Sequence, residues 1–177
     1  MNIFYLHRDP AIAAQMHCDK HCIKMILESA QLLSTAHRIL DGDAKGVLPD
    51  ERNDVLYKAT HRNHPSAVWV RRELDHYRWV HDLLYYLIAE FRYRYGKPHA
   101  TERLQPLLLN APHNIPMDGG FIMEDPPQCM PDDCKGPDTV EAYRKYYAKH
   151  KYSIAQWKRR DPPEWWNETV QGLHIGK

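Results

Sequence analysis

The sequence lacks the features that mark several protein classes. Four cysteines in 177 residues are too few for a disulfide scaffold. Neither the Cys18/Cys22 nor the Cys129/Cys134 spacing is C-x-x-C, so a zinc site made of cysteines alone is not expected. No apolar run is long enough for a membrane span, and "MNIFYLHRDP" meets charge too early for a signal peptide. We therefore expect an intracellular, cytoplasmic protein without a membrane partner.

An excess of charge of one sign is also missing. The chain has 24 Lys and Arg against 23 Asp and Glu, which argues against a protein that is basic all over but not against a local basic patch. Strand patterns are nearly absent, and we find no internal repeat or low-complexity segment. A chain of this length suffices for one domain with a genuine core. The expected fold is mainly α, a single compact helical domain over residues 1–177; its oligomeric state is left open.

Local signals predict four helical stretches. Asp9 as N-cap with Pro10 at the first position starts one that runs to about Leu40, unless Asp19 restarts it after a break. A second should run from "NHPSAVWV" to about Tyr95 and stop at Gly96. A shorter one over 100–110 has Thr101 as a possible cap. After a long Pro-rich irregular loop, 111–137, a capping box opens a basic aromatic helix over 138–160.

A polar stripe runs along the helix that contains "HCDKHCIKMILESAQLL". At about 100° per residue, an arc of roughly 80° contains His17, His21, Lys24, Glu28, Gln31 and Thr35. Apolar residues occupy almost all of the remaining surface of this helix, so it should be central to the domain, and its stripe should face a cleft, a partner or a narrow window of solvent. Lys24 and Glu28 could form only a weak surface ion pair. Alternatively, Glu28 is a general acid/base whose charge state His21 and Lys24 control.

Two histidine pairs allow further interpretations. His17 and His21 are one helical turn apart, and His61 and His64 of "THRNHP" could complete a metal site, although the Glu of H-E-x-x-H helices is missing. His61, Asn63 and His64 could instead contact phosphate or bases. The same residues also make an ordinary turn before Pro65.

The segment from Arg144 to Arg160 combines cations and aromatic rings. Its seven cations are Arg144, Lys145, Lys149, Lys151, Lys158, Arg159 and Arg160. Tyrosines such as Tyr146 and Tyr147 interleave with them, as on a surface that tracks phosphates and stacks bases. The rings could equally be the core face of a helix whose solvated face carries the cations.

Two short motifs resemble the pyrimidine dimer DNA glycosylases of the phage endonuclease V type. They are Asp19-Lys20-His21 followed by Glu28 seven residues after the histidine, and "YRKYYAK" at 143–149. The resemblance covers about the first 35 residues and this segment. It implies a helical, DNA-acting enzyme without a cofactor, which exposes a nucleotide and attacks its sugar through the N-terminal α-amine. Glu28 would support the resulting Schiff base. Candidate nucleic-acid contacts are His17, Asp19, Gln31, His61, Asn63, His64, Arg144, Lys145, Tyr146, Tyr147 and Lys149.

The sequence departs from that family at the nucleophile. The family exposes a small residue after losing its initiator methionine, whereas position 2 is Asn here, a poor candidate for that processing. Met1 could stay and offer its own amine. Lys24 could replace the arginine that precedes the family's Glu, or be the nucleophile if burial favours its neutral form. The candidate catalytic residues are therefore Met1, Asn2, His21, Lys24 and Glu28.

Three other functions fit the same patterns. One is an enzyme acting on modified bases or free nucleotides. Another is a non-catalytic nucleic-acid-binding or inhibitor protein that uses the stripe as a contact surface. The third is a metal-dependent hydrolase with histidine ligands.

Overall fold

The protein is mainly α-helical, as the sequence predicts. The computed structural model describes residues 1–117 and 122–173, and this part of the chain contains no strand. Its α-helices are α1 (Pro10–Met16), α2 (Asp19–Leu40), α3 (Arg52–Val55), α4 (Pro65–Val70), α5 (Leu74–Tyr95), α6 (Gln105–Leu108), α7 (Thr139–His150) and α8 (Glu164–Gly172). Three 3-10 turns are η1 (Ala100–Leu104), η2 (Asp132–Cys134) and η3 (Tyr152–Ile154). None of the described helices combines the length and apolarity that crossing a membrane requires.

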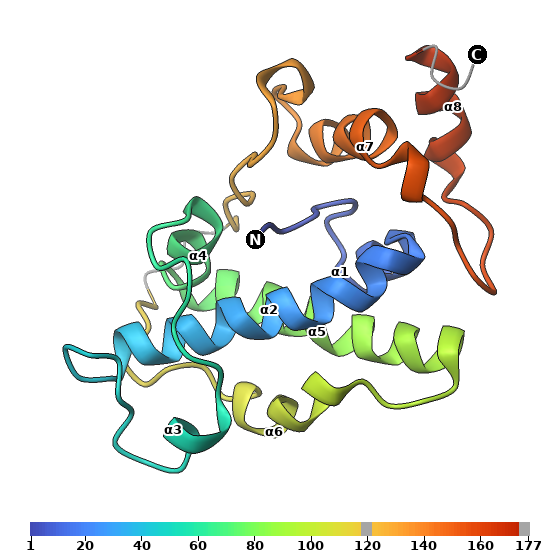
Figure 1. Cartoon of the computed structure of the whole chain (residues 1–177). Helices are drawn as coiled ribbons and strands as arrows, with labels where there is room; N and C mark the ends of the chain where they lie inside the picture. Colours follow the sequence, from blue (N-terminus) through green and yellow to red (C-terminus); the bar gives the residue numbers. More distant parts are fainter. Residues whose placement is uncertain (118–121, 174–177) are drawn as a thin grey trace.

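The two longest helices form the centre of the domain. α2 packs along α5, and α1 also packs on α5. α7 and α8 pack on each other and form a second layer above them (Figure 1). The extended N-terminal segment 3–6 is buried between the layers, and its four residues belong to the hydrophobic core. Phe4 of this segment contacts both layers, through His21 of α2 and Tyr147 of α7.

The helix that starts at Asp9 breaks before α2. Asp9 accepts from the Ala11 N–H and Pro10 is the first helical residue, both as predicted. The carbonyls that end α1 then find donors outside the helix: Arg94 donates to Gln15 O at 3.0 Å and to His17 O at 2.9 Å. Such long-range donors satisfy the exposed end of a helix and let the chain turn. Asp19 restarts the helix as its first residue, after an extended Cys18.

The predicted second helix is also two helices. α4 ends at Val70, and α5 begins at Leu74 after an extended Glu73. The turn is held by His76, whose ring stacks on Trp69 at 4.1 Å and hydrogen-bonds the Trp69 carbonyl at 2.8 Å. Gly96, at φ 66°, ends α5 as predicted.

Two further predictions need correction. Thr101 is not the cap of the next helix: the His99 side chain accepts from the Thr101 N–H, and the segment starts as a 3-10 turn. The predicted helix 138–160 keeps its cap, with Asp138 accepting from the Glu141 N–H, but ends at His150. Beyond it, the backbone bonds back to the start of α2 through the Asp19 N–H and Gln156 O at 2.8 Å. This pairing draws the chain out of the helix, and α8 follows after Pro163.

Candidate functional site

The start of the chain meets Glu28 of α2. The Met1 α-amine lies 3.9 Å from Glu28 Oε2, and the Asn2 backbone N–H donates to the same oxygen at 3.1 Å. Lys24, one turn earlier on α2, lies 3.2 Å from Glu28 Oε1. The Glu28 side chain is only 11% exposed, whereas that of Lys24 is 64% exposed. We call Met1, Asn2, Lys24 and Glu28 the N-terminal cluster.

The cluster joins four of the five candidate catalytic residues. A carboxylate beside an amine can accept a proton from it and return the proton later. The exposed Lys24 ammonium is the ion-pair partner of Glu28 on the solvent side of the cluster.

The loop before α4 borders the N-terminal cluster. Burial lowers the pKa of His64, and the positive N-terminal amine lowers that pKa further, while Glu28 opposes the shift. His64 Nδ1 accepts from the Ser66 N–H at 3.1 Å, so the proton of its neutral ring is on Nε2. His61 and Asn63 are exposed beside it. Gln31, half-buried, follows Glu28 by one helical turn.

The predicted polar stripe is mostly buried, and its first member, His17, lies before α2 rather than on it. His17, His21, Glu28 and Thr35 are buried, so a window of solvent does not describe it. His21 hydrogen-bonds the Tyr147 hydroxyl at 2.7 Å and packs on the Phe4 ring at 4.3 Å. Burial lowers the pKa of His21 to about 3 and that of His17 to about 4, so both rings are neutral at neutral pH. These two histidines therefore have a structural role, in contacts with Phe4 and Tyr147.

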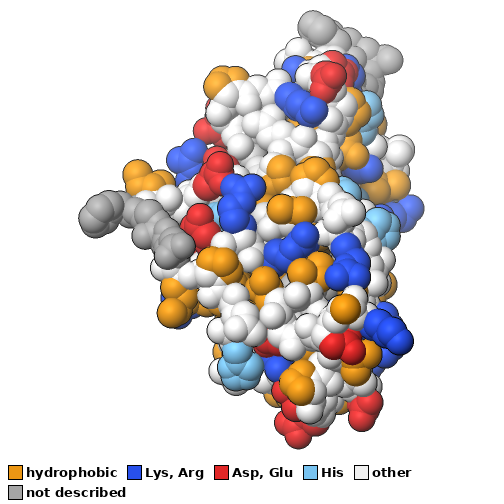
Figure 2. Space-filling model, turned by 90° about the vertical axis from the view of Figure 1, so that its left-hand side faces the viewer, with side chains coloured by type: hydrophobic (Ala, Val, Ile, Leu, Met, Phe, Trp, Pro, Cys, Tyr) orange, Lys and Arg blue, Asp and Glu red, His pale blue; other side chains and the backbone are white. Residues whose placement is uncertain are grey.

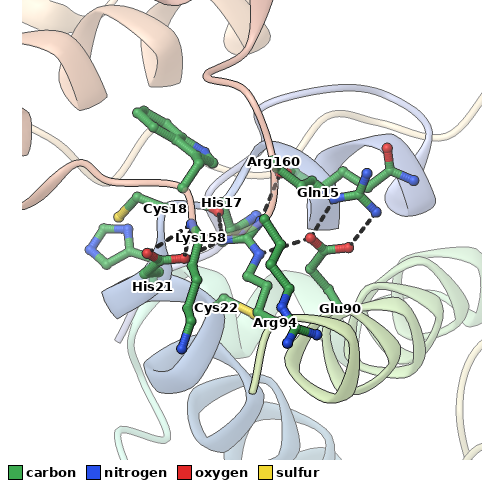
Figure 3. A network of polar contacts seen from close by, with 12 residues as sticks. Gln15, His17, Cys18, His21, Cys22, Glu90, Arg94, Lys158 and Arg160 are labelled. Carbon is green, nitrogen blue, oxygen red and sulfur yellow. Dashed lines mark hydrogen bonds and ion pairs between the residues drawn. The ribbon is translucent and has the colours of Figure 1, made fainter. Parts of the chain in front are cut away.

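Asp19 belongs to a separate polar network. Arg94 is fully buried and lies 2.8 Å from Glu90 Oε1 (Figure 3). Its guanidinium also lies 2.9 Å from Asp19 Oδ1. Asp19 also accepts from the Lys158 N–H, and Arg160 pairs with Glu90 from the other side. The network ties α1, α2 and α5 to the segment that follows α7. The Asp19 carboxylate is therefore engaged within the fold and is not free to contact a nucleic acid.

The basic aromatic segment divides between core and surface. Tyr143 and Tyr147 are buried, as expected if the rings form the core face of the helix. Tyr146 is half-buried and stacks on Phe4 at 6.0 Å. Arg144 donates to the Leu6 carbonyl at 3.0 Å and lies over the Trp165 ring. Among the other cations of α7, Lys149 pairs with Asp133, and Lys145 is half-buried.

Two grooves flank Arg144 and Trp165. The larger, of about 1100 Å³, is also lined by Arg159 and Arg160, and the smaller, of about 560 Å³, by Lys145. Acidic side chains line both, so neither is purely cationic. Neither is lined by a residue of the N-terminal cluster. On another face, Figure 2 shows Lys and Arg standing among hydrophobic and acidic side chains rather than in one broad basic field.

The four histidines of the predicted metal site do not assemble. Within the described residues, the group whose ligand atoms come close enough for a metal ion is Asp133, Cys134 and His150. There the Lys149 ammonium already contacts the Asp133 carboxylate. A neighbouring cation opposes the binding of a metal ion, so this group is weak evidence for a site.

The residues that hold the N-terminal segment in place are not evident from the sequence. Asn2 Nδ2 donates to Cys129 O at 2.9 Å, and the Tyr143 hydroxyl lies 2.8 Å from Asn2 Oδ1. No local pattern could have paired these residues, because they are more than 120 positions apart in sequence.

Comparisons with protein-family models, with curated proteins and with solved structures gave no match to this chain.

Proposed function

We propose that this protein is a DNA N-glycosylase with an associated lyase activity, and that the N-terminal α-amine is its nucleophile. The observation that carries the proposal is the 3.9 Å approach of the Met1 amine to the buried Glu28 carboxylate. An α-amine is a suitable nucleophile because its ordinary pKa is close to neutral pH. The resemblance of Asp19-Lys20-His21…Glu28 to pyrimidine dimer DNA glycosylases supports the same chemistry.

The reaction would begin with attack of the free amine on the anomeric carbon C1′ of a damaged or modified nucleotide. The bond between C1′ and the base breaks, and the base leaves with the bonding electrons. Glu28 takes the proton that the nitrogen loses and returns it to O4′ as the C1′–O4′ bond opens, which gives the Schiff base. Glu28, again a carboxylate, would then take a C2′ proton; the electrons of that C–H bond form the C2′–C3′ double bond, and the phosphate leaves with the electrons of the C3′–O bond. Water then adds to the Schiff base carbon and releases the amine.

The surroundings of the N-terminal cluster suit a bound nucleotide. Lys24 is exposed and positively charged, and the exposed His61 and Asn63 offer hydrogen bonds to phosphate or base edges. Arg144 and Lys145 line the grooves of the neighbouring layer and would contact the DNA backbone. The target nucleotide would have to leave the base stack to reach the amine.

Borohydride trapping tests the proposal. The protein is mixed with duplexes carrying a pyrimidine dimer, an abasic site or no lesion, and a covalent adduct is expected with the first two. Glu28→Gln keeps an oxygen that accepts from the Asn2 N–H but cannot accept a proton, so trapping should fall by about 10²-fold or more. Binding of the duplex should change little.

Lys24→Met is the matched comparison, since it removes the other charged partner of Glu28. Trapping should survive in this variant; its complete loss would move the nucleophile to Lys24. An intact protein that binds DNA without any adduct would overturn the proposal in favour of a non-catalytic nucleic-acid-binding protein.

A further inference from the structure

The first residue of the chain is part of the packed structure. The Met1 side chain is 2% exposed and lies against the hydrophobic core. Asn at position 2 also disfavours removal of the methionine. If Met1 were removed, the nitrogen beside Glu28 would belong to Asn2, at 3.1 Å. The two cases therefore assign the reactive amine to different residues.

Both the Nδ2 and the Oδ1 atoms of the Asn2 side-chain amide form hydrogen bonds. Nδ2 donates to the Cys129 carbonyl at 2.9 Å, and Oδ1 accepts from the Ile3 N–H at 2.8 Å. Oδ1 also lies 2.8 Å from the Tyr143 hydroxyl. The Asn2 backbone N–H donates to Glu28, so both the backbone N–H and the side-chain amide of this residue are hydrogen-bonded.

The Tyr143 hydroxyl extends this anchor into the rest of the fold. It lies 2.7 Å from the Pro127 carbonyl, so its proton is shared between Pro127 O and Asn2 Oδ1, and it accepts from the Cys129 N–H at 3.3 Å. Tyr143 is fully buried on α7. One hydroxyl thus joins α7, the loop at 127–129 and the second residue of the chain.

We propose that Met1 stays on the mature protein and carries the reactive amine, and that Asn2 is the positioning residue that holds this amine against Glu28. This inference rests on the function proposed above. Asn2 fixes the peptide that follows the amine, so the amine can move only about the bonds of Met1 itself. Fixing a reacting group in this way matters because a misplacement of about 1 Å can lower a rate by about 10²-fold.

Mass spectrometry of the purified chain and of the trapped adduct tests which amine reacts. The chain is expected to begin at Met1, and the peptide that carries the sugar remnant should be modified at the Met1 nitrogen. A chain that begins at Asn2, or an adduct on Lys24, would overturn the assignment.

Variants of the anchor test the role of Asn2. Asn2→Ala should slow single-turnover trapping at saturating DNA by about 10²-fold, with little change in the Kd for DNA. Tyr143→Phe removes one anchor and should slow it by about 10-fold. Asn2→Asp adds a carboxylate that stabilises the protonated amine, so the pH of half-maximal trapping should move upward.

Tyr77→Phe is the matched control, because its buried hydroxyl hydrogen-bonds Leu108 O and His37, which are not members of the N-terminal cluster. Equal rates for Asn2→Ala and wild type, or equal losses for Tyr143→Phe and Tyr77→Phe, would refute a positioning role.

A chemical probe separates this inference from the proposed function. Pyridine-2-carboxaldehyde condenses with an α-amine and then closes onto the amide nitrogen of the second residue, which donates to Glu28 here. Asn2→Ala removes the side-chain hydrogen bonds that hold this amide against Glu28, so the amide should become more accessible and labelling should be several-fold faster than in wild type. Tyr77→Phe should be labelled at the wild-type rate. If no DNA adduct forms but this difference holds, the anchor stands and the glycosylase function fails. If DNA is trapped but Asn2→Ala and wild type have equal rates of labelling and of trapping, the proposed function stands and the positioning role of Asn2 fails.

Discussion

Buried histidines, among them His17, His21 and His37, should make the protein lose stability in mild acid. Burial lowers the pKa of His17 and of His37 to about 4 each, from an ordinary value of 6.5. Above pH 6.5 both states of the protein leave these rings neutral, so the rings add no pH dependence there. As the pH falls below 6.5, the unfolded chain gains protons that the native rings cannot take until about pH 4, and stability is lost throughout this window.

The size of the loss follows from the two pKa values. At about pH 5, an unfolded histidine is almost fully protonated and the buried one is not, which costs about 2 kcal/mol per ring. His17 and His37 lie in different networks, the first beneath Phe4 and Tyr147 and the second between Tyr77 and Arg52. Their contributions should therefore add to about 4 kcal/mol, a large part of the stability of a typical domain.

His17→Phe tests this reasoning, because it keeps an aromatic ring in the same space but cannot titrate. The free energy of unfolding is measured by denaturant titration at about pH 7 and about pH 5, followed by tryptophan fluorescence. The variant should lose about 2 kcal/mol less than wild type between the two conditions, whatever its stability at neutral pH. His150→Gln, at an exposed position, is the control and should keep the wild-type difference. If His17→Phe keeps it too, the buried ring does not cause the pH dependence.

Two further predictions concern stability. Arg94→Met would leave the carboxylates of Asp19 and Glu90 with fewer partners and the end of α1 without its donors, so we expect a loss of about 3–5 kcal/mol in denaturant unfolding; a loss below 1 kcal/mol would contradict the network's role. Gly96→Ala should cost about 1 kcal/mol, because Gly96 ends α5 at φ 66°; Gly136→Ala, which meets no atom within 4 Å and has no positive φ, should be close to neutral by the same measurement.

Much of the local structure was predictable from short patterns. Asp9 with Pro10, Gly96, and Asp138 with Glu141 each begin or end a helix through contacts that span only a few residues. Helical periodicity also accounts for the 3.2 Å approach of Lys24 to Glu28 on α2, whereas His17 of the predicted stripe lies before that helix. The lengths of the helices were not predictable in the same way. The segment after His150 has helical periodicity, yet its backbone pairs with Asp19, which only the packed structure could reveal.

By itself, the sequence determined the helical class, the caps at Asp9, Gly96 and Asp138, and the grouping of polar residues on one side of α2, because each depends on neighbours along the chain. The tertiary structure decided what that grouping faces. It buries His17 and His21 under Phe4 and Tyr147, and it brings the Met1 amine to Glu28 across 27 residues of chain. It also joins Asn2 to Tyr143 across 141 residues. Contacts at such separations depend on how the layers pack, and no local pattern of side chains encodes them.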